Sequence, residues 1–275
     1  MKRSKKNIRV GILGCGAIGS GIAKSISKEL KGACRLTGLL DRDADKTTAL
    51  AKTLKDPKLG KRSLKELLAG CDLMVEAVNA ADTKPLIRQA LLAKKDVLCM
   101  SVGKLLNAQN LLKLALKNHC TILIPSGAIA GIDAIKAACL KGVSRISLTT
   151  RKPPAGLQGI PYLEQQGIDL TKLSSETVIF EGDVNTAVKF FPQNINVAAT
   201  LALASQQKSN LTIRIITSPT YTVNSHEIEL IGSMGRIFTR SESIACPDNP
   251  KTSYLAGLSG IQTLKEYCSG VRVGT

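Results

Sequence analysis

The sequence predicts a doubly wound parallel α/β domain followed by an α+β domain with a mostly antiparallel sheet, and three observations lead to this fold class. In the first half, short apolar runs alternate with segments of helical spacing, as in repeated βα units. In the second half, strand-like runs outnumber helical ones, and Gly232-Ser233-Met234-Gly235 predicts a hairpin turn between two of them. A chain of 275 residues is long enough for two modest domains.

The alternation of apolar runs and helical segments can be followed up to residue 125. We expect strands over residues 8–13, 35–40, 72–78, 96–100 and 120–124, and helices over residues 18–30, 44–54, 63–68, 82–93 and 108–117. Such an order of elements predicts parallel pairing with right-handed crossovers. The ligand crevice of this fold lies at the carboxyl ends of the strands. Residues 14–17, 78–80 and 101–103 are therefore expected around the ligand.

The character of the sequence changes near Pro125, where we place the boundary between a domain of residues 1–125 and one of residues 126–249. The second domain is expected to hold helices over residues 132–140 and 196–205, strands over residues 143–151, 211–216, 221–230 and 236–241, and a loop over residues 152–161. A last helix, over residues 253–268 of the segment 250–275, is expected to pack back on the first domain.

A glycine-rich motif of sequence GCGAIG follows the first strand and opens the first helix. Gly14 would allow the tight turn, Gly16 would let the backbone approach a pyrophosphate, and Gly19 would let the helix pack against its strand. The phosphates would then bind the free N–H groups at the positive end of the helix. The motif predicts a Rossmann dinucleotide-binding site, contacted by Gly14, Gly16, Ala17, Ile18 and Gly19.

An acidic residue supports this interpretation, since Asp41 ends the second apolar run about 20 residues after the last glycine. Its carboxylate is expected to accept hydrogen bonds from the adenosine ribose, which favours NAD. Arg42 follows directly and could face the 2′-phosphate of NADP. The motif predicts NAD or NADP as cofactor and leaves the preference open.

The composition argues against nucleic-acid binding in spite of a net charge of +17. The lysines and arginines are scattered along the chain, and the one dense cluster is the run from Lys2 to Lys6. Aromatic residues make up 3% and tryptophan is absent, so few side chains can stack on bases. We interpret the charge as a solvated surface that also steers anionic small molecules, and we expect a small-molecule substrate.

The cysteines and histidines predict no metal site. Eight cysteines form no CxxC pair, and the two histidines are too few for a zinc cluster. Several cysteines lie inside apolar runs, as small hydrophobic residues do in a reducing compartment. The basic N-terminus is followed by an apolar run too short for a signal peptide or a membrane span. We therefore expect a cytoplasmic protein without a membrane partner.

Two histidines are available for catalysis, and the residues alone favour structural roles for both. His119 ends a predicted helix, where a cation interacts well with the helix dipole. His226 lies in a predicted strand and shares its face with Ile228 and Leu230, which is typical of a buried core histidine.

Two small segments of the second half carry further candidates. Either Asn194 or Asn196 can cap the helix that follows, and the other amide could bind a cofactor carboxamide or a substrate. Residues 126–131 are small and glycine-rich. Their backbone could approach a nicotinamide, or could serve only as a tight connection.

Taken together, the segments GCGAIG, PSGAIAGIDAI, TTRKPP, FPQNINVAATLALA, NSHEIEL and NPKTSYLAGLSGIQTLKEY resemble the L-aspartate dehydrogenase family over nearly the whole chain. The resemblance implies a Rossmann domain and a second domain, which carries the substrate site and forms the interface of a homodimer. It also implies NAD or NADP as cofactor. It implies that His226 is the catalytic histidine and that Ala130 and Asn196 contact the nicotinamide cofactor.

The resemblance also implies a reaction. L-aspartate would be oxidised to iminoaspartate, which is hydrolysed to oxaloacetate and ammonia, or the reverse, and iminoaspartate can feed pyridine nucleotide biosynthesis. Two carboxylates require cationic or amide donors, for which Arg151 and Asn194 are the candidates. The alternatives are another two-domain dehydrogenase, related to homoserine dehydrogenase or dihydrodipicolinate reductase, and a non-catalytic dinucleotide sensor that binds nucleic acid.

Overall fold

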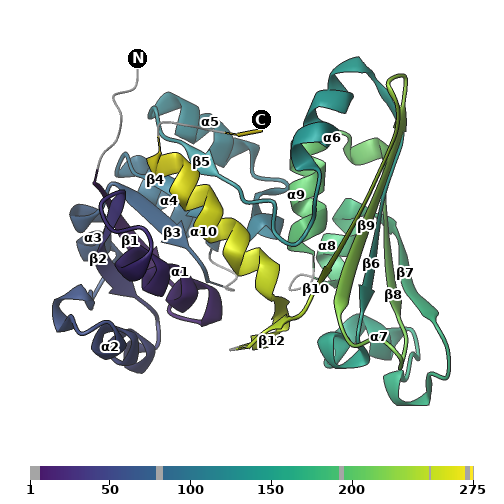
Figure 1. The fold of residues 1–275 in the computed structure, drawn as a ribbon, viewed down its shortest axis with the longest axis horizontal. Helices are drawn as coiled ribbons and strands as arrows, with labels where there is room; N and C mark the ends of the chain where they lie inside the picture. Colours follow the sequence, from purple (N-terminus) through teal and green to yellow (C-terminus); the bar gives the residue numbers. More distant parts are fainter. Residues whose placement is uncertain (1–6, 79–82, 192–194, 248, 270–272, 275) are drawn as a thin grey trace. The chain divides into compact units, whose positions relative to one another are not determined.

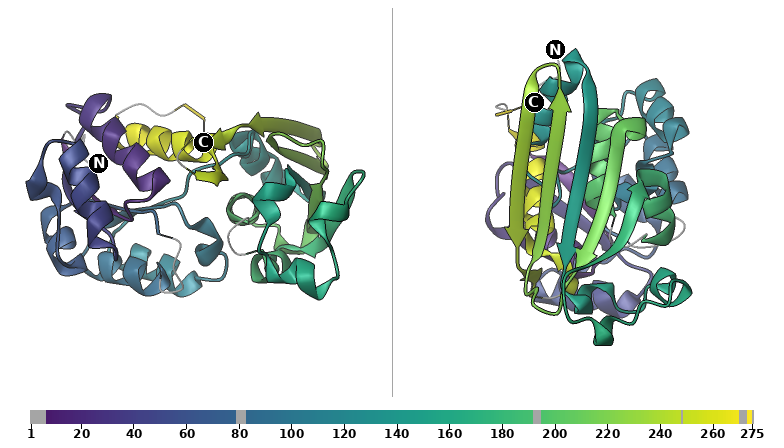
Figure 2. Two further views of the ribbon diagram at one scale, coloured as in Figure 1. Left: turned by 90° about the horizontal axis from the view of Figure 1, so that it is seen from below. Right: turned by 90° about the vertical axis from the view of Figure 1, so that its right-hand side faces the viewer.

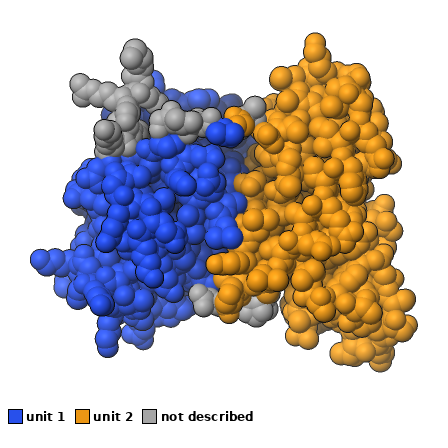
Figure 3. All heavy atoms as spheres, in the orientation of Figure 1, with its two compact units in different colours: residues 1–125, 257–273 blue, residues 126–256, 274–275 orange. Residues whose placement is uncertain are grey.

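The computed structural model describes residues 7–78, 83–191, 195–247, 249–269 and 273–274. The chain divides into two compact units (Figure 3): unit 1 comprises Met1–Pro125 with Gly257–Val273, and unit 2 comprises Ser126–Ala256 with Gly274–Thr275. Each unit has its own sheet and its own buried residues. None of the described helices is long and apolar enough to cross a membrane.

Unit 1 is built on a five-stranded sheet whose paired strands are all parallel (Figure 1). The order is β2-β1-β3-β4-β5, with β1 at Ile8–Leu13, β2 at Cys34–Leu40, β3 at Leu73–Glu76, β4 at Asp96–Cys99 and β5 at Ile122–Leu123. The predicted doubly wound parallel sheet is confirmed. Because the strand order reverses between β1 and β3, the loops that follow these two strands border the crevice in which such sheets bind ligands.

The helices of unit 1 follow the predicted alternation. They are α1 (Ala17–Lys28), α2 (Ala44–Thr53), α3 (Leu64–Gly70), α4 (Thr83–Leu92), α5 (Gln109–Lys117) and α10 (Tyr254–Cys268, within unit 1 from Gly257), with 3₁₀ turns η1 (Pro57–Leu59) and η2 (Val102–Leu105). The side chains of Asp43 and Ser63 accept hydrogen bonds from the first turns of α2 and α3, as N-caps do. Asp82, expected to begin α4, lies outside the described residues.

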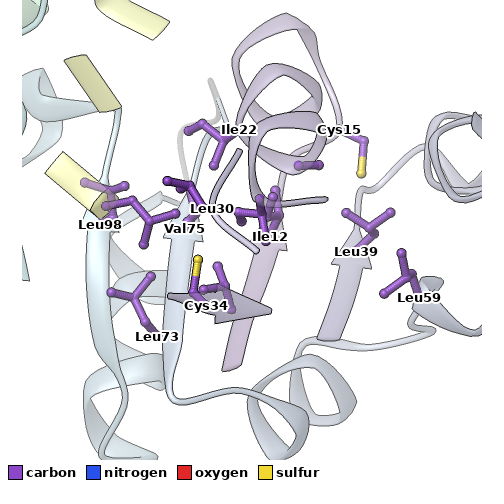
Figure 4. Close-up of a cluster of buried hydrophobic side chains, with 14 of the residues drawn as sticks. Ile12, Cys15, Ile22, Leu30, Cys34, Leu39, Leu59, Leu73, Val75 and Leu98 are labelled. Atoms are coloured by element: carbon purple, nitrogen blue, oxygen red, sulfur yellow. The ribbon is translucent and has the colours of Figure 1, made fainter. Parts of the chain in front are cut away.

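The core of unit 1 joins helix α1 and the sheet (Figure 4), and helix α10 contributes to it. Ile12, Ile22 and Val75 are fully buried there. Leu264 of α10 belongs to the same cluster, and the hydroxyl of Tyr267 donates a hydrogen bond to the Asp96 carboxylate. The C-terminal helix is thus held by apolar packing and by a polar contact at its end.

Unit 2 contains a mixed five-stranded sheet in the order β10-β9-β6-β8-β7. Only the β6–β8 pair is parallel, so the predicted, mostly antiparallel sheet is confirmed. The strands are β6 (Val143–Lys152), β7 (Thr177–Asp183), β8 (Leu211–Thr217), β9 (Asn224–Gly232) and β10 (Gly235–Ser243), with a separate pair β11 (Ala245–Cys246) and β12 (Asn249–Ser253).

Helices lie over one face of this sheet and leave its other face uncovered by helices of the same unit (Figure 2, right). They are α6 (Ile132–Ala138), α7 (Pro161–Gln165), α8 (Val184–Phe190) and α9 (Asn196–Ser205), with 3₁₀ turns η3 (Cys139–Lys141), η4 (Pro154–Leu157), η5 (Leu170–Lys172) and η6 (Lys208–Asn210). The inner face buries apolar side chains such as Leu148 and Ile228. The outer face carries charged residues in ion pairs.

Several elements differ from the sequence prediction. Strand β3 ends at Glu76 instead of residue 78, because the N–H of Val78 donates to the Glu76 side chain and leaves the ladder. Strand β9 begins at Asn224 instead of residue 221, because the N–H of Tyr221 closes a turn onto the carbonyl of Ser218. Strand β7 and helices α7 and α8 were not predicted.

Candidate active site

The three glycines of the GCGAIG motif have three different surroundings. Gly14 adopts φ +102°, and a Cβ there would lie 2.5 Å from the carbonyl oxygen of Ala77. A Cβ on Gly19 would lie 1.8 Å from the carbonyl oxygen of Gly14. A Cβ on Gly16 would meet no atom within 4 Å. Gly14 and Gly19 are therefore required by the fold itself, whereas at Gly16 the fold leaves room beside the backbone.

The N-terminus of α1 fits a dinucleotide pyrophosphate. The helix starts at Ala17, with Ile18 and Gly19 completing its first residues, and Gly16 occupies the cap position without a side-chain hydrogen bond. The first turn of this fully described helix contains no acidic residue. A helix N-terminus with free N–H donors and a positive dipole end binds phosphate oxygens, and the open space at Gly16 allows a ligand to approach them.

Asp41 braces the glycine loop. Its Oδ2 accepts a hydrogen bond of 2.7 Å from the N–H of Cys15, and its Oδ1 accepts one of 3.0 Å from the N–H of Asp43. Each carboxylate oxygen has a second lone pair, so Asp41 keeps capacity for a ribose hydroxyl. The structure thus joins Asp41 to the GCGAIG loop, while Arg42 is exposed beside it.

A buried carboxylate that the sequence analysis did not identify organises the neighbouring loops. Glu76 is 0% exposed at the end of β3, and burial raises its pKa. It accepts hydrogen bonds from the N–H of Val78 (3.0 Å) and from the N–H and hydroxyl of Ser101 (3.1 and 2.9 Å). Two of the segments expected at the ligand, after β3 and after β4, are thereby tied together; residues 79 and 80 lie outside the described part of the chain.

In unit 2, the loop of residues 126–131 is fastened to strand β10. The hydroxyl of Thr239 donates to the carbonyl of Ala130 (3.2 Å), and that of Ser241 donates to the carbonyl of Ala128 (2.5 Å). In the ladder, Ser241 pairs with His226 of β9. The loop that carries Ala130, which is itself exposed, is therefore joined through one strand to the strand of the candidate histidine.

Helix α9 begins at residue 196, one residue earlier than it would if Asn196 were its N-cap. Asn196 is its first residue and is exposed, whereas Ile195 occupies the cap position and offers no side-chain hydrogen bond. Asn196 is thus not the N-cap, which was one of the two roles considered for it. Asn194, the other candidate amide, lies outside the described residues.

His226 lies on the inner face of the sheet and is 5% exposed. Its Nδ1 is 3.0 Å from the hydroxyl of Thr150, its direct partner in the β6–β9 ladder. Burial, and then the positive charge of Lys152, lower the pKa of His226 to about 3. The imidazole is therefore neutral at physiological pH. A threonine hydroxyl can donate or accept, so Thr150 supports either neutral tautomer and leaves Nε2 able to accept or donate a proton.

Arg151 does not join His226. Side chains alternate along a strand, and Thr150 and His226 share the inner face, so Arg151 points to the outer face. There its guanidinium forms ion pairs with Glu227 (2.7 Å) and Glu176 (3.6 Å). The residue that shares the face of Thr150 is Lys152, which is 7% exposed.

The fold and these two sites define a nicotinamide-dependent dehydrogenase with a dinucleotide-binding unit and a separate α+β unit. Two family models match the chain: one described as "Homoserine dehydrogenase, NAD binding domain" over residues 14–125, and one described as "Aspartate dehydrogenase, C-terminal" over residues 133–267. L-aspartate dehydrogenase of Methanosarcina mazei is 42% identical over 272 residues, covering 98% of this chain and 100% of the relative. That of Methanococcus maripaludis is 40% identical with the same coverage. The chain belongs to the L-aspartate dehydrogenase family, whose members are oxidoreductases acting on a CH–NH₂ group.

Solved structures show the same fold. The crystal structure of aspartate dehydrogenase from Thermotoga maritima has a TM-score of 0.73 at 22% identity and covers 98% of this chain and 100% of its own. A homoserine dehydrogenase from Thiobacillus denitrificans has a TM-score of 0.61 at 14% identity, covering 96% and 73%. At 14% identity the homoserine dehydrogenase structure shows the fold alone, whereas the relatives about 40% identical in sequence identify the family.

Proposed function

We propose that the protein catalyses the NAD(P)-dependent oxidation of L-aspartate to iminoaspartate, which water converts to oxaloacetate and ammonia, and the reverse reductive amination. The observation that carries this proposal is His226: a buried, neutral imidazole held by Thr150, in a chain 42% identical to a curated L-aspartate dehydrogenase. The product iminoaspartate would be available for pyridine nucleotide biosynthesis.

His226 performs the proton transfers of this reaction. A bound nicotinamide would supply the acceptor for the hydride lost from Cα. His226 can take the proton of the substrate ammonium, which frees the nitrogen lone pair that assists the loss of hydride, or the proton of the water that attacks the imine carbon. Thr150 keeps the ring in place: when Nε2 is free to take the proton, Nδ1 carries the hydrogen and donates it to the Thr150 hydroxyl, before and after Nε2 is protonated. Ala130 and Asn196 are proposed to contact the cofactor.

The dinucleotide is NAD or NADP, and it is proposed to bind at the GCGAIG loop. Asp41 favours NAD, because its carboxylate can accept a hydrogen bond from the 2′-hydroxyl and repels a 2′-phosphate. Arg42, the exposed neighbour, offers a cation to the 2′-phosphate of NADP. We therefore expect activity with both and a higher kcat/KM with NAD.

The proposal is tested by the absorbance of the reduced nicotinamide, with purified protein, L-aspartate and either cofactor at alkaline pH. We expect reduction with L-aspartate and none with D-aspartate, L-glutamate or L-homoserine. Reduction with L-homoserine alone would favour a homoserine dehydrogenase instead. A protein that binds the dinucleotide but reduces it with none of the four would keep the cofactor site and lose the substrate assignment.

We further propose a homodimer formed by the outer face of the unit 2 sheet. Positive and negative groups alternate over this face, as in the ion pairs Arg145–Glu229 (2.8 Å) and Arg240–Glu227 (3.1 Å), and Phe238 is 56% exposed on it. Mixed charges around an exposed aromatic side chain complement a second copy of the same surface. Light scattering after size exclusion is expected to give a dimer for the natural chain and a monomer for Phe238→Lys; a monomeric natural chain would refute the proposal.

The proposed compartment is the cytoplasm. None of the eight cysteines, all of which the structure describes, forms a disulfide, and Cys15, Cys34, Cys71 and Cys99 are buried. Free thiols in such number persist where the surroundings are reducing.

A further inference from the structure

The inner face of the unit 2 sheet changes from apolar to polar at one end. Along β6 the inward residues Ile146 and Leu148 are followed by Thr150 and Lys152. Along the neighbouring β9, which runs the opposite way, the inward residues change in the same place, from Ile228 to His226. Buried polar side chains in adjacent strands thus form one patch, and Lys152 lies in it two residues from the direct partner of His226.

Lys152 is a cation in an interior position. Its side chain is 7% exposed, and burial lowers the pKa of its ammonium to about 8. At pH 7 the charged form still exceeds the neutral form by about ten to one. Taking an ammonium group out of water costs desolvation free energy, and a methionine of similar length would not incur that cost.

The chemistry of the substrate suggests a role for a cation at this position. L-aspartate and oxaloacetate each carry two carboxylates, and an enzyme that binds them needs a cationic donor beside the group that moves the proton. His226 is neutral and cannot supply that charge. Arg151, the other cation at this end of β6, lies on the outer face and binds Glu227 and Glu176.

We propose that Lys152 binds a carboxylate of the substrate next to His226 and thereby makes the site specific for dicarboxylates. This inference rests on the proposed function. Because the ammonium contacts a carboxylate that changes little during the reaction, its binding energy is the same in the ground state and in the transition state. Loss of Lys152 should then raise KM and leave kcat nearly unchanged.

The decisive variant is Lys152→Met, which keeps the length of the side chain and removes the charge. The KM for L-aspartate is expected to rise about 10- to 100-fold, the loss typical of a charge-assisted hydrogen bond. The kcat and the Kd for NAD are expected to stay within about threefold. The matched control is Lys172→Met, whose ammonium is at the surface of the same unit with its side chain 82% exposed, and which should leave KM unchanged.

A second measurement separates the role of Lys152 from the identity of the reaction. Succinate has the two carboxylates and no amine, so its binding in the presence of NAD, followed by calorimetry, needs no turnover. Succinate is expected to bind the natural chain about 10- to 100-fold more tightly than Lys152→Met. If L-aspartate is not oxidised but this difference is found, the proposed function fails and the carboxylate site stands.

Two results would overturn the inference. The first is a folded Lys152→Met variant, judged by its circular dichroism and NAD binding, with unchanged KM and unchanged succinate affinity. The second is a Lys152→Met variant with unchanged KM whose kcat falls on the acid side at a higher pH than the kcat of the natural enzyme. That result would mean that Lys152 acts only on the pKa of His226.

Discussion

Replacement of His226 by asparagine is expected to lower kcat for L-aspartate by about 10²- to 10⁴-fold, the range that a positioned acid–base group contributes. Asparagine is similar in size and can keep a hydrogen bond to Thr150, whose hydroxyl lies 3.0 Å from Nδ1, so the sheet is expected to remain intact. It cannot accept the proton of the substrate ammonium or of water. The Kd for NAD, measured by fluorescence titration, is expected to stay the same.

A matched control is available because the chain has one other histidine. His119 is exposed in unit 1, after the end of α5, and His119→Asn should leave kcat unchanged. The natural enzyme should show no limb near pH 6.5 in kcat/KM, because the pKa of His226 is lowered to about 3 and the ring stays neutral down to that pH. If His226→Asn kept more than a tenth of the natural kcat, the proton transfers would have to be assigned to another group.

The sheet explains why Arg151, one substrate candidate from the sequence, lies on the face opposite His226. Arg151 was a candidate because the two carboxylates of the substrate require cationic or amide donors. The period of two along β6, with Ile146, Leu148 and Thr150 buried, places Lys152 on the face of His226 and Arg151 on the other. The sequence prediction ended this strand at residue 151 and placed Lys152 in the following loop, whereas β6 extends to Lys152 and continues the alternation.

Unit 1 could be predicted almost element by element because its signals are local. Each strand is a short apolar run, helices α2 and α3 begin after the capping residues Asp43 and Ser63, and a βαβ order allows few topologies. The role of Glu76 could not be predicted, because its partners at Val78 and Ser101 are brought together only by the folded sheet.

Unit 2 was predicted less completely, for a physical reason that β7 illustrates. Its register against β8 shifts between Val178 and Phe180, and as a result Ile179 and Phe180 are both buried. This bulge destroys the alternation by which a half-buried strand is recognised. The parallel pairing of β6 with β8 could not be predicted from local sequence either, because it joins segments about 65 residues apart.

Replacement of Gly19 by alanine is expected to damage both the stability of unit 1 and the binding of the dinucleotide. The added Cβ would lie 1.8 Å from the carbonyl oxygen of Gly14. Both atoms belong to or are attached to backbone, so no side-chain rotation relieves the clash, and α1 must move away from β1. We expect the free energy of unfolding to fall by about 2–3 kcal/mol, the upper range for overpacking, and the Kd for NAD to rise because the phosphate-binding N-terminus of α1 is displaced.

Two neighbouring glycines separate these effects. Gly21 lies in the same helix, and a Cβ there would meet no atom within 4 Å. Gly21→Ala should therefore leave the Kd for NAD unchanged. It should raise the free energy of unfolding by about 0.5–1 kcal/mol, because glycine destabilises a helix interior relative to alanine.

At Gly16 the space is equally open, yet in our proposal this space faces the bound dinucleotide. Gly16→Ala should therefore weaken NAD binding without loss of stability, measured by urea unfolding and calorimetric titration of the three variants. Equal NAD affinity for Gly16→Ala and Gly21→Ala would contradict the placement of the pyrophosphate at this loop, whereas a stable Gly19→Ala would contradict the close packing of α1 on the glycine turn.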